Sequence, residues 1–182
     1  MTANVVPMHA VDGVEIGLDR DVFFRKMLRE LSGTIEAIVG VDEAAGYVSA
    51  VGAAIGDWIN EAYHAEMGPE DFDLDTVASV FVDLKRRIDG GFFIEEVAAD
   101  RIVLGNTRCP FGDDVNDRPS LCMMTSNVFG RIAADNLGYA RVRLDQTIAT
   151  GDPRCRIVVE LAPRDGVTPN EREYFRLPKD EG

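Results

Sequence analysis

The hydrophobic periodicity of this chain changes at Gly90-Gly91, and that change constrains the fold more than any other feature. Before the glycine pair, apolar residues recur every three or four positions, which is typical of amphipathic helices. Directly after it, short apolar runs separated by turn residues indicate strands. The sequence therefore predicts an α+β fold in which N-terminal helices pack on a sheet formed by later strands.

Three helices are expected before the glycine pair, over residues 21–39, 42–66 and 74–88. The second is unusual because it contains Gly46, Gly52 and Gly56, and a glycine inside a helix costs about 1 kcal/mol relative to alanine. Close packing of another backbone offsets that cost. This helix is therefore expected to be central or to lie at a dimer seam, and we predict that the chain forms a homodimer.

Turn residues divide the remaining sequence into two predicted hairpins with a helix between them. The strands are expected over residues 92–97, 101–104, 139–149 and 156–161, and the intervening helix over 119–136. These strands would form a roughly four-stranded antiparallel sheet. A single domain, residues 21–162, is then flanked by an N-terminal arm of residues 1–20 and a C-terminal tail of residues 163–182, which is expected to lie over the surface or fray.

The three cysteines of the chain are expected to meet at one end of this sheet. Cys109 follows the second predicted strand, and Cys122 lies in the first turn of the next helix, where the helix dipole favours a thiolate. That helix carries the chain back by roughly 27 Å, and the third strand returns it to the original end. Cys155, beside the start of the fourth strand, therefore lies near the other two.

Three convergent thiols predict a metal centre. Soft sulfur ligands suit zinc or an iron–sulfur cluster, and both usually take four ligands. The fourth ligand could be Asp113, Asp114 or Asp117, a water, or an exogenous molecule. A redox thiol site and ordinary buried cysteines remain the alternatives, and haem is disfavoured.

Charge and composition limit the partners. Nineteen basic and thirty-two acidic residues leave a net charge of −13, which disfavours direct nucleic-acid binding. No apolar run approaches the ~20 residues of a membrane-spanning helix, and the N-terminus lacks the pattern of a signal peptide, so we expect a cytoplasmic protein with reduced thiols. Neither His9 nor His64 lies in the cysteine half, so a cysteine-dependent enzyme is only a minor alternative.

The cysteine region resembles known sensory domains. The residues that carry the likeness are Cys109-Pro110-Phe111-Gly112, Cys122, Phe129-Gly130-Arg131, Thr150-Gly151-Asp152 and Cys155. They resemble the output domain described in methanogens, and also the C-terminal sensory half of the Suf-operon repressors. In those repressors two cysteines separated by twelve residues, with a later third, hold an iron–sulfur cluster, and twelve residues likewise separate Cys109 from Cys122. The topology over residues 21–161 is similar to the 4-vinyl reductase domain superfamily, whose sensor domains often dimerise.

The resemblance implies a sensory or regulatory domain that binds an iron–sulfur cluster, of the 4Fe-4S type, through Cys109, Cys122 and Cys155. Such a domain would respond to redox state, oxygen or nitric oxide and would signal through a protein partner. The alternative is a zinc-stabilised sensor that binds a small apolar ligand in a pocket between helices and sheet. The side chains expected to line that pocket are Phe92, Ile94, Val103, Met124 and Phe129.

Overall fold

The helices of the N-terminal half begin and end close to the expected residues. The computed structural model describes residues 12–166, 168 and 170–176, and it contains α1 (Arg20–Val39), α2 (Val41–Met67) and α3 (Leu74–Arg86). Asp19 and Asp73 cap α1 and α3, because each side chain accepts a hydrogen bond from a backbone N–H three residues ahead. Gly40 ends α1 with a φ of 87°, a backbone conformation that favours glycine.

The second half of the chain forms an antiparallel sheet with one helix inserted. Its elements are β1 (Phe92–Ala98), β2 (Arg101–Asn106), the short 3₁₀ turns η2 (Gly112–Val115) and η3 (Pro119–Leu121), α4 (Cys122–Leu137), β3 (Tyr139–Gln146), the 3₁₀ turn η4 (Ile148–Thr150), β4 (Cys155–Glu160) and β5 (Glu171–Phe175). The strand order is β1-β2-β4-β3-β5. The predicted α+β class is confirmed, and the two hairpins join through β2 and β4.

The sheet has five strands, one more than the sequence indicated. β5 pairs with β3 and lies inside the range expected to be a C-terminal tail, of which residues 177–182 are outside the described residues. Tertiary contacts hold this strand. The ring of Tyr174 packs against Gly130 of α4, where a Cβ atom would collide with it, and its hydroxyl hydrogen-bonds to Ser126 at 2.9 Å. Residues 147–149, expected at the end of the third strand, instead turn away into η4.

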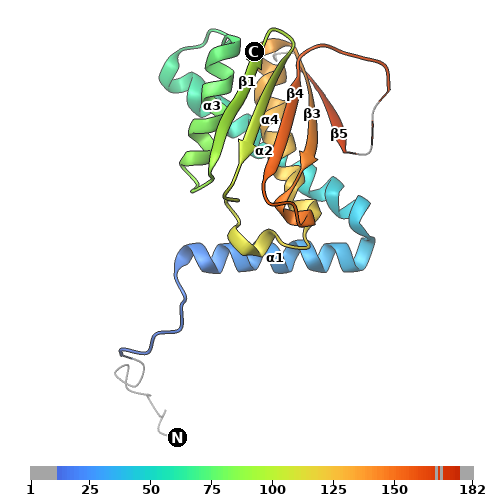
Figure 1. Ribbon diagram of the computed structural model, residues 1–182. Helices are drawn as coiled ribbons and strands as arrows, with labels where there is room; N and C mark the ends of the chain where they lie inside the picture. Colours follow the sequence, from blue (N-terminus) through green and yellow to red (C-terminus); the bar gives the residue numbers. More distant parts are fainter. Residues whose placement is uncertain (1–11, 167, 169, 177–182) are drawn as a thin grey trace, which may run out of the picture.

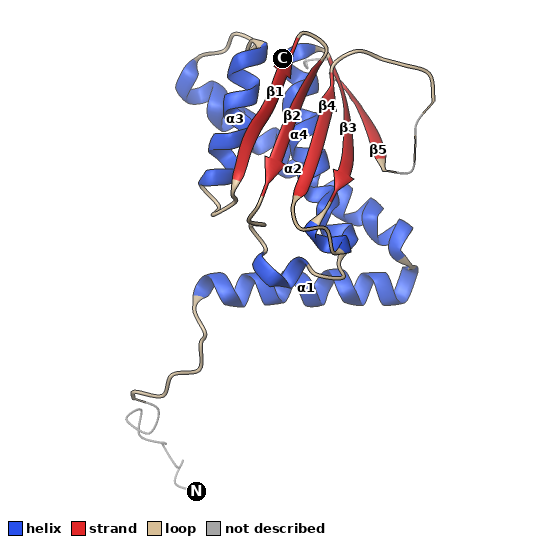
Figure 2. Cartoon of the chain, in the orientation of Figure 1, coloured by secondary structure: helices blue, strands red, loops and turns tan. Residues whose placement is uncertain are grey.

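Helices cover one face of the sheet and one of its ends. α2, α3 and α4 lie behind the strands, whereas α1 runs across the end at which β2 leaves the sheet and β4 enters it (Figures 1 and 2). The opposite face is free of helices and carries ion pairs between neighbouring strands, such as Arg143 with Glu160 at 2.8 Å and Arg141 with Glu173 at 2.8 Å. The sheet is therefore apolar on the helix side, and its other face combines these ion pairs with buried apolar side chains such as Val103 and Val158.

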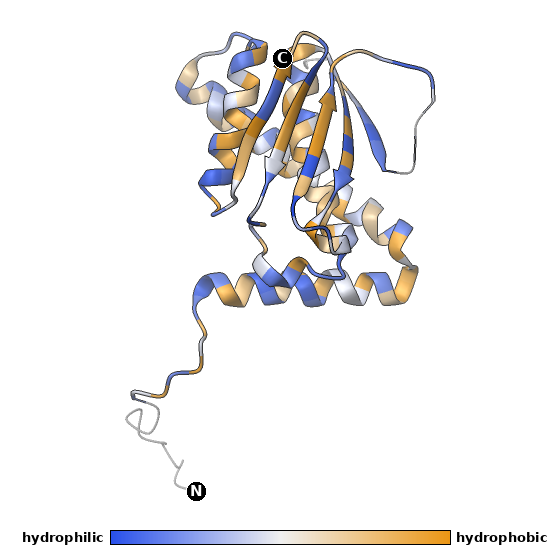
Figure 3. Ribbon diagram, viewed as in Figure 1, coloured by the Kyte–Doolittle hydropathy of each residue, from blue (hydrophilic) through white to orange (hydrophobic). Residues whose placement is uncertain are grey.

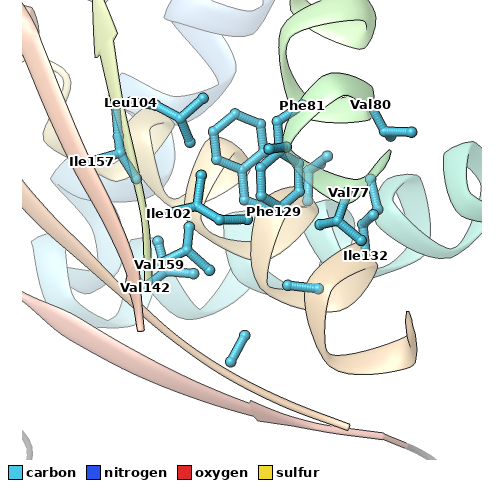
Figure 4. Packing of buried hydrophobic residues seen from close by; sticks show 14 of the residues in the cluster. Val77, Val80, Phe81, Ile102, Leu104, Phe129, Ile132, Val142, Ile157 and Val159 are labelled. Carbon is cyan, nitrogen blue, oxygen red and sulfur yellow. The ribbon is translucent and has the colours of Figure 1, made fainter. Parts of the chain in front are cut away.

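The main core, as we call it, fills the space between the sheet and the three covering helices. At its centre the rings of Phe81 and Phe129 stack with their centroids 4.3 Å apart (Figure 4). Phe92 meets Phe129 edge-on, with the ring centroids 5.6 Å apart. Apolar side chains from β2, β3 and β4 close the stack from the sheet side. Phe129 is fully buried, so this expected member of a ligand pocket is a core residue.

The glycines of α2 allow it to approach α4 of the same chain. A Cβ atom on Gly52 would lie 2.8 Å from Asn127 Cβ, and one on Gly56 would lie 2.9 Å from Arg131 Cβ. Of the two expected placements, α2 is therefore central, and α4 covers the glycine face that was considered for a dimer seam. The homodimer itself stays a prediction, and exposed apolar side chains elsewhere on α1 and α2, such as Leu31 and Trp58, are available for it.

Polar bonds hold α1 against the loop between β2 and α4. The Lys26 ammonium pairs with Asp114 at 2.7 Å, and Arg29 donates to the carbonyls of Asp114 and Asn116 at 2.7 and 2.6 Å. Ser120 donates to Glu36 at 2.5 Å. Colouring by hydropathy shows charged and apolar residues alternating along α1, in contrast to the apolar interiors of β2 and β4 (Figure 3). α1 thus forms the floor of the loop that carries Cys109 and leads to Cys122.

Candidate thiol site

The structure brings all three cysteines to one cavity at the end of the sheet that α1 covers. Cys109 lies just after β2, Cys122 is the first residue of α4, and Cys155 is the first residue of β4. Each thiol is free and half-buried. The route inferred from the sequence, out along β2, back along α4 and out again along β3, is the route the chain takes (Figure 1).

A small apolar cluster separate from the main core surrounds the cavity. We call it the thiol cluster, and it consists of Val115, Leu121, Ala149, Phe111, Ile148, Cys109 and Cys122. The cavity that it lines together with Cys155 has a volume of about 30 Å³. That volume accommodates one or two water molecules or a single ion. Of the five residues expected to line an apolar ligand pocket, Phe92 lines this cavity.

Burial favours the protonated form of the Cys109 and Cys122 thiols. It raises the pKa of the Cys122 thiol to about 12, and this effect outweighs the hydrogen bond from the Thr147 side chain, which acts in the opposite direction. Burial likewise raises the pKa of Cys109, against a backbone hydrogen bond from Phe111. The thiolate expected at Cys122 is therefore not favoured, because burial and the two neighbouring cysteines raise the pKa of this thiol. The Cys155 sulfur accepts a hydrogen bond from the Ile148 N–H at 3.5 Å.

Lys85 is a buried charged residue beside the thiol cavity that the sequence analysis did not identify. This lysine of α3 is only 3 % exposed, and its ammonium group donates to the Thr125 hydroxyl at 2.9 Å and lies 5.1 Å from the ring centroid of Phe92. Burial lowers its pKa to about 8, while negative charge on the three thiols would raise it. In the part of the chain that the structure describes, no carboxylate pairs with this ammonium. The available signal was its spacing, four residues after Phe81 on the apolar side of the helix.

The expected fourth ligands lie elsewhere. The Asp114 carboxylate is turned toward α1 and its partner Lys26, and neither Asp113 nor Asp117 lines the thiol cavity. His64 stacks on Phe72 near the end of α2, with ring centroids 4.2 Å apart, and is not part of the cavity lining. His9 lies outside the described residues. The structure therefore brings together the thiols but neither the aspartates nor a histidine.

The spacing and the chemistry of the three thiols can be compared with what the predicted metal centre requires. Over residues 12–166, 168 and 170–176, no group of three or more histidine, cysteine, aspartate or glutamate side chains is spaced to hold a metal ion. The chemistry of the donor set does fit a soft metal, because three thiols line one apolar cavity beside a cation. A cubane cluster of four irons and four sulfides exceeds a cavity of about 30 Å³, so it would require the walls to move apart. Both metal centres stay predictions.

A second, more polar space lies on the other side of Cys122. This cleft has a volume of about 240 Å³ and is bounded by the start of α2, η3, and the chain around η4. Cys122, Leu144 and Thr147 line both the cleft and the thiol cavity. These three residues thus form the partition between the site and the cleft.

The arrangement defines a class: an α+β domain with helices on one face of an antiparallel sheet and a thiol-lined cavity at the sheet end. The chain belongs to the methanogen output domain 1 family, because the sequence model of that family matches residues 27–160. This match confirms the resemblance to a methanogen output domain, while the resemblance to the Suf-operon repressors stays a prediction.

Comparison with solved structures supports the same fold. The chain is similar to a trafficking protein particle complex subunit 3 from Naegleria fowleri, a structure described as covalently bound to palmitic acid. The TM-score is 0.54 and the identity 13 %, and the match covers 85 % of this chain and 99 % of the other. No curated protein matches the chain. Within the described residues, none of the helices combines the length and apolarity needed to span a membrane.

Proposed function

We propose that this chain is a cytoplasmic sensory or regulatory domain that binds one thiophilic metal ion, zinc, through Cys109, Cys122 and Cys155. The observation that carries the proposal is the convergence of three free thiols from three separate segments on one cavity. Thiols at such a site stay reduced in the cytoplasm. The three sulfurs would hold the ion as thiolates, and the ion supplies the charge that makes thiolates stable in a buried place.

The volume of the cavity favours a single ion over an iron–sulfur cluster. About 30 Å³ suits a single ion, whereas an iron–sulfur cluster, the first expectation from the sequence, needs the surrounding loops to open. A palmitoyl chain, the ligand in the structurally similar trafficking subunit, is also larger than the volume of this cavity. The small apolar ligand of the alternative was expected in a separate pocket between helices and sheet, so it stays a prediction, and a single zinc ion is the occupant that the thiol cavity favours.

The sensing step follows from the spacing of the thiols. Without metal the sulfurs share a cavity but are not spaced as a ligand set, so binding must move at least one of their segments. The loop after β2 is bonded to α1 through Lys26 and Arg29, and a movement of Cys109 would therefore be transmitted to α1. α1 exposes apolar residues such as Phe24 and Leu31, which a protein partner or a second copy of the chain can contact. The net charge of −13 disfavours a nucleic acid in that role.

Metal analysis of the purified protein tests the proposal. Protein isolated without oxygen and without chelators is expected to be colourless, with one zinc ion per chain and no acid-labile sulfide. Cys122→Ser should lower the zinc association constant at least ~100-fold, because it removes a direct ligand. Met123→Leu, at the next position, is the matched control and should retain the metal. Stoichiometric iron and sulfide would establish the cluster instead, and full zinc content in Cys122→Ser would reject the site.

A further inference from the structure

Lys85 places a positive charge beside the thiols, and no carboxylate among the described residues pairs with it. Its side chain is buried, one of its N–H groups donates to Thr125 at 2.9 Å, and the rings of Phe92 and Phe129 lie 5.1 and 5.2 Å away. Thr125 and Phe92 also line the thiol cavity. A buried charge of this kind is costly unless an opposite charge compensates it, and the fixed groups around it supply only a hydroxyl and ring faces.

The net charge of the occupied centre determines whether the Lys85 ammonium gains a compensating negative charge. When a divalent ion binds, three S–H bonds break, three metal–sulfur bonds form and three protons leave, so the centre carries one negative charge. When arsenite binds, its three As–O bonds are replaced by As–S bonds and three waters leave, so the centre is neutral. Only the divalent centre neutralises Lys85 inside a space of low dielectric constant, where charge pairs interact strongly.

We propose that Lys85 is a specificity-determining residue of the thiol cavity, where it selects a divalent ion over a trivalent one through its buried charge. The inference rests on the proposed metal-binding function and deepens it. Lys85 acts on the charge of the centre and is not itself a ligand. Beside a neutral three-thiol centre, the Lys85 ammonium would stay buried without a compensating negative charge.

The experiment compares zinc and arsenite binding to the whole chain and to Lys85→Met, which keeps the length of the side chain and removes the charge. The variant is expected to bind zinc on the order of tenfold or more weakly, while its arsenite affinity stays equal or rises. Its metal-free form should melt at a higher temperature than the wild type, because an apolar side chain replaces a buried charge. Affinities come from competition with a chromophoric chelator or dithiol, and melting from circular dichroism.

Arg86→Met is the matched control, because it removes the same charge from the solvent-exposed side of α3. It should leave both affinities unchanged. Equal losses for zinc and arsenite in Lys85→Met would show a structural role and overturn the inference while leaving the metal site intact. Unchanged zinc affinity in that variant would overturn it as well. If the wild type binds arsenite but no zinc, the proposed function fails and the charge selection fails with it.

Discussion

The main core and the thiol cluster lie in one domain but are packed in different ways. In the main core, aromatic rings stack at 4.3 Å and apolar side chains from the sheet close around them (Figure 4). In the thiol cluster, Val115, Leu121 and Ala149 are buried, the cysteines are only half-buried, and a cavity of about 30 Å³ remains. The first region supplies the apolar burial that stabilises the fold, and the second retains space for an occupant.

The comparison predicts its largest effect at the centre of the main core. Phe129→Ala should lower the free energy of unfolding by about 3–5 kcal/mol, because it leaves a cavity under the Phe81 ring. Leu121→Ala in the thiol cluster should cost less, about 2 kcal/mol, since that region already contains a void. Urea denaturation followed by circular dichroism measures both. An equal or greater cost for Leu121→Ala would show that the thiol cluster is packed as tightly as the main core.

A pair of glycines on α2 sharpens the comparison at the edge of the main core. Gly52→Ala should destabilise the protein by about 1–3 kcal/mol, because the new methyl group would lie 2.8 Å from Asn127 Cβ and 3.3 Å from Met124 Cα. Gly46→Ala meets no atom within 4 Å and should stabilise the helix by about 0.5–1 kcal/mol. Thermal melting separates them. A stabilised Gly52→Ala would mean that α2 and α4 do not approach as described.

Lowering the pH should weaken stabilising interactions at the outside of the main core but not those of the thiol cluster. Asp83 accepts hydrogen bonds from Tyr63 at 2.6 Å and from Arg87 at 2.6 Å, and these bonds hold its pKa well below the usual range. Because the folded pKa is depressed, this stabilisation is present above the unfolded pKa of about 4 and is lost as the pH falls through and below it. Buried thiols with raised pKa values stay protonated throughout.

Asp83→Asn should therefore flatten the dependence of stability on pH between about pH 5 and pH 2, by about 1 kcal/mol for a partly exposed group. Urea denaturation at several pH values measures the slope. Asp75→Asn, in the first turn of the same helix, serves as the control. If the slope of the wild type persisted in Asp83→Asn, other carboxylates would carry the acid sensitivity.

Local signals in the sequence were enough for most of the fold and for the thiols. Apolar periodicity placed α1–α3, and the direction of the chain placed Cys109, Cys122 and Cys155 together, because both depend on short segments. β5 escaped prediction, since the sequence Glu171–Phe175 lacks regular alternation and its pairing depends on Tyr174 meeting α4. The direction of the Asp114 carboxylate likewise depends on a long-range contact, because its partner Lys26 lies 88 residues earlier.

The burial of Lys85 depends on the same kind of contact. Its helix was predicted, but only the assembled tertiary structure shows that the ammonium lies between two aromatic rings and the cysteines. Helix periodicity alone cannot distinguish a lysine that extends to solvent from one whose head group is enclosed. This is why the convergence of the thiols could be inferred from the sequence and the neighbouring charge could not.

The partition formed by Cys122, Leu144 and Thr147 gives the thiol cavity and the cleft a common wall. Movement of any of these three side chains therefore changes the shape of both spaces at once. A molecule held in the cleft would accordingly alter the cavity without contacting its interior.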